Sequence, residues 1–81
     1  MRIEWDEPKR LANLDKHGMD FVDLTLAFFD SASALESRLG RFVATGFFKG
    51  RAIVVVYRPL GTEAVSVISM RRASKPERIA P

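Results

Sequence analysis

The sequence predicts one α+β domain, spanning residues 1–81, in which N-terminal helices pack on an antiparallel β-meander sheet. A chain of 81 residues is long enough for one domain and too short for two. Helix start and stop signals dominate the first 30 residues, whereas three strand-like runs joined by short turns fill residues 41–70. Turns of this length join antiparallel strands, because parallel strands need a longer crossover.

The N-terminal part is predicted to form a short strand and then a helix. Met1–Glu4 is the candidate strand. An acidic residue followed by proline, as in Asp6-Glu7-Pro8, is typical of a helix start. Cations followed by glycine, as in Lys16-His17-Gly18, are typical of a helix end. We expect Leu11 and Leu14 to form the apolar stripe of this helix.

A second helix is predicted to begin at Asp20, which would cap it. Its apolar residues fall on two stripes, one formed by Phe21, Leu24 and Phe28 and the other by Val22, Leu26 and Phe29. A helix that is apolar on so many sides is expected to be largely buried.

The C-terminal half carries the strand signals. After a connector over residues 30–40, with a short edge strand near Ala34–Glu36, the predicted strands are Arg41–Phe48, Arg51–Arg58 and Glu63–Met70. Turns fall at Lys49-Gly50 and at residues 59–62. Strand alternation would place Ala64, Ser66, Ile68 and Met70 on one face and Val65, Val67, Ser69 and Arg71 on the other. Ser74 and Glu77 then predict a capping box and a short, truncated C-terminal helix, because the chain ends at Pro81.

The composition excludes several classes of site. The chain has no cysteine, which excludes disulfides, thiolate zinc sites and cysteine catalysis and is typical of the reducing cytoplasm. It has one histidine and no carboxylates at ligand spacing, so we expect no metal and no cofactor. No apolar run approaches the ~20 residues of a membrane-spanning helix, and the N-terminal residues lack the apolar stretch of a signal peptide. We therefore expect a cytoplasmic protein without a membrane partner.

Charge is divided unevenly along the chain. Residues 1–40 hold five Lys/Arg against eight Asp/Glu, whereas residues 41–81 hold eight against two. Arginine binds phosphate in bidentate fashion, so a basic half favours a nucleic-acid partner, although a solvated basic surface is the alternative. Strand direction places Arg41 beside Arg58 and Arg71 at the opposite edge, so topology predicts no single arginine cluster.

Both faces of the predicted sheet are partly apolar. One face can take the helices, and the other is expected to form an interface with a second copy or a partner. The alternative is that the connector and the tail cover it.

Two groups of residues resemble one family. Trp5-Asp6, Lys9, Asn13 and Lys16-His17-Gly18 open the chain, and Ile68-Ser69-Met70-Arg71-Arg72-Ala73-Ser74 with Glu77-Arg78 ends it. In this order and spacing they resemble the BrnT family of toxins over nearly the whole chain. The resemblance implies a type II toxin–antitoxin system and a fold similar to the RelE-type ribonucleases, with RNA cleaved without metal. It also implies a cognate antitoxin that neutralises the toxin by direct binding and binds operator DNA through a ribbon-helix-helix domain.

The resemblance points to five candidate catalytic residues. Metal-free cleavage uses the 2′-hydroxyl as nucleophile and needs a base, an acid and cations on the phosphate. The candidates are His17, Lys9, Arg41, Arg71 and Glu77. His17 is an acid–base candidate or a helix-terminal histidine, and Lys9 a phosphate contact or a solvated lysine. The two arginines would bind phosphate or pair with the acidic half, and for Glu77 we favour capping of Ser74 over general-base catalysis.

Two functions remain open at this point. The first is a metal-independent endoribonuclease held inactive by its antitoxin. The alternative is an inactive or truncated toxin-like module that only binds its antitoxin or nucleic acid, because the family continues into a longer charged helix where this chain ends. We expect a homodimer or a toxin–antitoxin heteromer, formed through the sheet and residues 74–81, in which Arg71 is covered.

Overall fold

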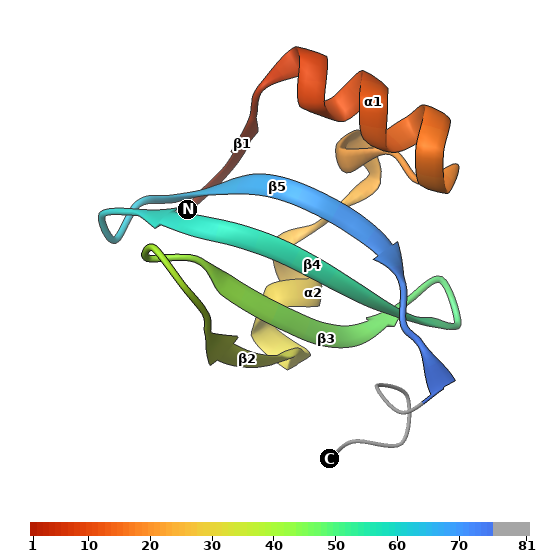
Figure 1. Cartoon of the computed structure of the whole chain (residues 1–81). Helices are drawn as coiled ribbons and strands as arrows, with labels where there is room; N and C mark the ends of the chain where they lie inside the picture. The colour runs from red at the N-terminus through yellow and green to blue at the C-terminus, as the bar shows by residue number, and fades with distance from the viewer. Residues whose placement is uncertain (76–81) are drawn as a thin grey trace.

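The computed structural model describes residues 1–75 and shows a five-stranded sheet with one helix behind it and the first helix along one edge (Figure 1). In chain order the elements are β1 (Arg2–Trp5), α1 (Glu7–His17), the 3-10 helix η1 (Phe21–Asp23), α2 (Leu26–Ser31), β2 (Ser33–Glu36), β3 (Phe42–Phe48), β4 (Arg51–Leu60) and β5 (Ala64–Arg72). The predicted α+β class is confirmed. The predicted C-terminal helix, with Glu77, lies outside the described residues. Within residues 1–75 no helix is long and apolar enough to cross a membrane.

The sheet is mixed, which corrects the prediction of a wholly antiparallel one. Its strand order is β1-β5-β4-β3-β2, and β1 runs parallel to β5, from Arg2 opposite Ala64 to Trp5 opposite Val67. The other neighbouring strands are antiparallel. Short turns exclude parallel pairing only between consecutive strands. The whole of the intervening chain connects β1 to β5, which is ample for a crossover.

Helix α1 has the predicted ends but not the predicted stripe. Pro8 lies in its first turn, and Gly18 after its last residue adopts the left-handed conformation (φ 68°) that glycine favours. Leu11 and Leu14 are 53% and 37% exposed, so they do not anchor the helix. The buried residue of α1 is a polar one, Asn13, which is 7% exposed.

Asn13 ties α1 to the sheet through its side-chain amide. Its Oδ1 accepts from the Met70 N–H at 3.0 Å, and its Nδ2 donates to the carbonyl oxygens of Met70 at 2.9 Å and Met19 at 3.0 Å. The β1 ladder ends where Trp5 lies opposite Val67, before Met70 is reached. Asn13 therefore supplies the backbone of β5 with the partners that a neighbouring strand would have given.

The predicted second helix is divided in two. Leu24 and Thr25 are extended, with ψ of 144° and 161°, so η1 ends before α2 begins. Asp20 caps η1 as expected by accepting from the Val22 N–H at 3.0 Å. The first apolar stripe is buried as predicted: Phe21, Leu24 and Phe28. The second is buried only in part: Val22 and Leu26 are exposed, whereas Phe29 is half-buried and packs against Tyr57 beside the core.

A bulge in β5 changes which of its residues share a face. Tyr57 lies opposite Val67 and Val56 opposite Ser69, which leaves Ile68 as an extra residue on β5. Val67 and Met70 therefore both enter the core beside Ile53 and Val55. The predicted grouping of Met70 with Ser66, and that of Val67 with Ser69 and Arg71, is wrong. The opposite side, here called the outer face, carries the side chains that point away from α2: Leu35, Val43, Thr45, Phe47, Val54, Val56, Arg58, Ser69 and Arg71.

Arg10 joins the start of α1 to the segment before η1. Its Nη1 donates to both carboxylate oxygens of Asp20 (3.1 and 2.9 Å), and its Nε and Nη2 donate to Glu7 (2.7 and 3.0 Å). The pKa of Asp20 is lowered, chiefly by the hydrogen bond from the Val22 N–H and further by Arg10. The pKa of Glu7 is lowered by hydrogen bonds from Arg10 and from the indole of Trp5.

Asn13→Ala is expected to destabilise the fold by about 3 kcal/mol, because the N–H and C=O of Met70 lose their partner inside the protein. For a domain of this size the thermal midpoint should fall by roughly 10–20 °C. Asp15→Asn, a change at an exposed position two residues later in α1, should leave the midpoint within a few degrees. Equal midpoints for the wild type and Asn13→Ala would show that α1 is held by something else.

Acid should weaken the fold partly through Asp20. A carboxylate whose folded pKa is depressed contributes stability above its unfolded pKa of about 3.9, and this is lost as the pH falls through the folded value. Between pH 6 and pH 2.5 the midpoint of the wild type should therefore fall further than that of Asp20→Asn, which should begin lower at pH 6. Thermal denaturation followed by circular dichroism measures both. Parallel pH curves for the two proteins would contradict the role given to Asp20.

Candidate functional site

A shallow groove between α1 and β5 brings two of the predicted catalytic residues together. Its volume is about 270 Å³, and its lining is Lys9, Ala12, Asn13, Lys16, His17, Ile68 and Ser69. Residues three and four apart share a helix face, which is why Lys9, Asn13 and Lys16 line the same wall. The bulge supplies the other wall, because it turns Ile68 and Ser69 toward α1. Lys9 and His17 thus belong to one site.

The groove carries positive charge with no acidic side chain in its lining. Within residues 1–75 the salt bridges join Arg2 to Glu4 and Arg10 to Glu7 and Asp20, so the groove lysines take no part in them. His17 is half-buried at the last position of α1. The arrangement places an imidazole beside two ammonium groups, which is suited to an oxyanion and to proton transfer next to it.

Arg71 continues this surface along β5. It lies two residues after Ser69 on the outer face, about 7 Å farther along the strand by the usual rise per residue. Its Nη1 donates to the carbonyl oxygen of Arg72 at 3.1 Å, and the residue is half-buried. Arg71 can therefore contact a chain that leaves the groove along β5.

Arg41 lies away from the groove. It precedes β3, at the end where Phe42 is opposite Tyr57, whereas Arg71 is opposite Val54, whose β3 partner is Thr45. Four residues along β3 separate Arg41 from Thr45, about 13 Å at the usual rise. The groove is lined by α1 and β5, and β4 lies between β5 and the strand that Arg41 precedes, so Arg41 does not line the groove with His17.

The register agrees with the predicted pairing of Arg41 with Arg58, since β3 begins where β4 approaches its end. Arg58 Nη2 donates to the carbonyl oxygen of Leu39 at 3.5 Å, which ties it to the turn before Arg41. The Nε of Arg41 is buried and has no hydrogen-bond partner among residues 1–75, and none of the salt bridges found there involves Arg41. The alternative of ion pairing with the acidic half therefore gains no support for Arg41.

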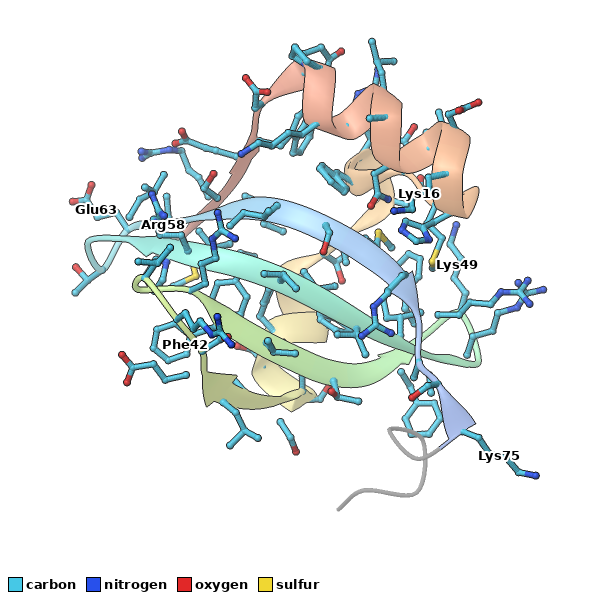
Figure 2. All side chains as sticks on the ribbon, viewed as in Figure 1. Lys16, Phe42, Lys49, Arg58, Glu63 and Lys75 are labelled. Carbon is cyan, nitrogen blue, oxygen red and sulfur yellow. The ribbon has the colours of Figure 1, made fainter. Side chains whose placement is uncertain are left out.

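Figure 2 shows this separation of the two ends. Lys16, from the end of α1, and Lys49, from the β3–β4 turn, lie toward one end of the molecule, and Arg58 and Phe42 lie toward the other.

Sequence reasoning missed Lys16 and Ser69 as members of the site. The spacing of Lys9, Asn13 and Lys16 could have revealed the first, whereas the second depends on a bulge with no local signal. Glu77 lies outside the described residues. No group of three or more His, Asp or Glu within residues 1–75 could hold a metal ion.

Comparison with known proteins decides the family. A family described as the ribonuclease toxin, BrnT, of type II toxin-antitoxin systems matches residues 5–77. The chain belongs to the BrnT family. It is also similar to the crystal structure of the Brucella abortus ribonuclease toxin, BrnT, with a TM-score of 0.88 and 51% sequence identity, covering 93% of this chain and 99% of that one. No curated protein matches the chain.

Membership of the BrnT family confirms the resemblance seen in the sequence. The chain is a ribonuclease toxin of a type II toxin–antitoxin system, and this class of toxin implies a cognate antitoxin. Family membership does not identify the residues that cleave RNA or the surface that binds the antitoxin. The groove is a candidate for the first and the outer face for the second.

Proposed function

We propose that this toxin is a metal-independent cytoplasmic endoribonuclease and that the groove between α1 and β5 is its active site. The observation that carries the proposal is that the only histidine of the chain lies with Lys9 and Lys16 in one groove. Cleavage without a metal requires protein cations where negative charge develops, and these two lysines provide them.

His17 acts as the general base in this proposal. It takes the proton from the 2′-hydroxyl, the 2′-oxygen bonds to the adjacent phosphorus, and the bond from phosphorus to the 5′-oxygen breaks. The products are a 2′,3′-cyclic phosphate and a 5′-hydroxyl, with the proton for the leaving oxygen supplied by an ammonium group of the groove. Lys9 and Lys16 stabilise the extra charge on the phosphorane oxygens.

The two arginines take different roles. Arg71 follows Ser69 along β5, so it is placed to hold a phosphate next to the reacting one. Arg41 is at the other end of the sheet, so we assign it to binding rather than to cleavage. The catalytic role of Glu77 stays a prediction from the sequence.

His17→Ala should lower the rate of cleavage of single-stranded RNA by about 100-fold or more, as removal of a general base usually does. Arg71→Ala should weaken RNA binding and lower the rate as well. Arg58→Ala is the matched control, an outer-face arginine of β4 that does not line the groove, and should cleave nearly as the wild type does. The assay measures cleavage in excess chelator and, in cells, arrest of growth by the toxin alone.

The outcome separates this proposal from its alternative. Loss of cleavage on adding chelator would exclude the metal-independent mechanism, and full activity of His17→Ala would remove the histidine from it. RNA binding by the wild type without any cleavage would favour the toxin-like module that only binds its antitoxin or nucleic acid.

We also propose that the cognate antitoxin neutralises the toxin by covering the outer face. Leu35 and Phe47 are 75% and 72% exposed there, and the half-buried Val43 and Val56 follow Leu35 across the sheet. Arg58 and Arg71 border these apolar residues, so an antitoxin segment with apolar and acidic side chains would be complementary to the surface. Covering Arg71 would deny it to RNA. The ribbon-helix-helix domain of the antitoxin would bind operator DNA. In the alternative assembly, two copies of the toxin pair through the outer face.

Phe47→Asp should weaken antitoxin binding by about tenfold or more, because a carboxylate replaces an apolar contact and repels acidic side chains. RNA cleavage should be unchanged, since Phe47 does not line the groove. Leu11→Asp introduces the same charge at an exposed leucine of α1 and should bind the antitoxin as the wild type does. Titration calorimetry measures both affinities. An unchanged affinity of Phe47→Asp would place the antitoxin elsewhere.

A further inference from the structure

A second pocket lies beside the groove and has no part in the proposed cleavage. It has a volume of about 520 Å³ and lies where the end of α1 and η1 meet the β3–β4 hairpin. Four apolar side chains contribute to its lining, Leu14, Met19, Phe48 and Met70. Pockets of this size hold small organic ligands, and an apolar lining with an aromatic ring is suited to the flat face of a nucleobase.

Charged side chains of both signs complete the lining without pairing. The hairpin contributes Lys49 and Arg51, and η1 contributes Asp23. Within residues 1–75 the side chains of these three residues take part in none of the hydrogen bonds or salt bridges found. The Nζ of Lys49 instead lies 5.3 Å from the centre of the Phe48 ring. The other acidic residue of the lining, Asp20, is already bound to Arg10 and to the Val22 N–H.

A nucleotide would meet all these groups at once. Its phosphate would bind Lys49 and Arg51, and its base would lie against the apolar lining. The carboxylate of Asp23 can only accept hydrogen bonds, so it favours a base edge rich in donors. Guanine presents two adjacent donors, N1–H and N2–H, which a carboxylate can accept together. Adenine, cytosine and uracil present no such pair.

The pocket is also placed to serve the groove. Leu14 and Gly18 line the pocket, whereas Lys16 and His17, between them in the sequence, line the groove. Figure 2 shows Lys16 and Lys49 toward the same end of the molecule. One RNA strand could therefore run from the groove around the end of α1, with its next base in the pocket.

We propose that this pocket is a nucleobase subsite, that it selects guanine through Asp23, and that it holds the nucleotide next to the cleaved phosphate. The proposal rests on the proposed function in taking RNA as the ligand. Its binding step can be tested without any cleavage.

The experiment titrates the full chain with the 5′-monophosphates of guanosine, adenosine, cytidine and uridine, followed by NMR. Guanosine monophosphate should bind about tenfold more tightly than the others and shift the amides of Asp23 and Lys49. Asp23→Asn should remove this preference, and Asp15→Asn, the same change on the exposed surface of α1, should retain it. Lys49→Ala should weaken all four nucleotides by a similar factor, because it contacts only the phosphate.

Equal binding of the four nucleotides by the wild type would overturn the proposal, as would a guanine preference that survives Asp23→Asn. Mapping the cleavage sites in RNA separates the two proposals. Cleavage without any preference for a neighbouring guanine would contradict the subsite and leave the ribonuclease in place. Selective binding of guanosine monophosphate without RNA cleavage would support the subsite and contradict the mechanism.

Discussion

The hydrogen bonds between the Asn13 side chain and the backbone of Met70 are the contact on which this architecture depends. Strand β1 leaves β5 after Trp5, and without Asn13 the next edge groups of β5 would lose their partner. The same contact fixes the only long helix of the described chain against the strand that carries Ser69 and Arg71. Of the two residues in this contact, Asn13 lines the groove and Met70 lines the pocket that we propose for guanine.

Electrostatics divides the N-terminal half into a structural part and a binding part. Arg10 gathers Glu7 and Asp20 into one network that joins α1 to η1, which engages two of the acidic residues of that half. Lys9 and Lys16 belong to the same helix but line the groove. A ribonuclease needs such separation, because a carboxylate beside the groove lysines would compete with the phosphate of the substrate.

Local signals were sufficient to predict much of the fold. Pro8 and Gly18 mark the ends of α1 because they act through their own backbone conformation, and the core stripe of Phe21, Leu24 and Phe28 was predicted from spacing alone. Three features were not predictable because they depend on distant partners. These are the parallel pairing of β1 with β5, the bulge at Ile68, and the burial of Asn13 in place of two leucines. The site was likewise predictable only in part. The sequence offers Lys9, His17 and Arg41 as candidates, but only the fold shows that the first two share a groove and that Arg41 does not line it.

In the mechanism that we propose, RNA binds where α1 is tied to β5. NMR mapping of the full chain tests this with a short RNA that is 2′-O-methylated at each position, so that no 2′-hydroxyl can attack. We expect the largest shifts to cluster at residues 9–17 and 68–71. Shifts confined to the end of the sheet with Arg41 and Arg58, with the amides of α1 unchanged, would contradict it.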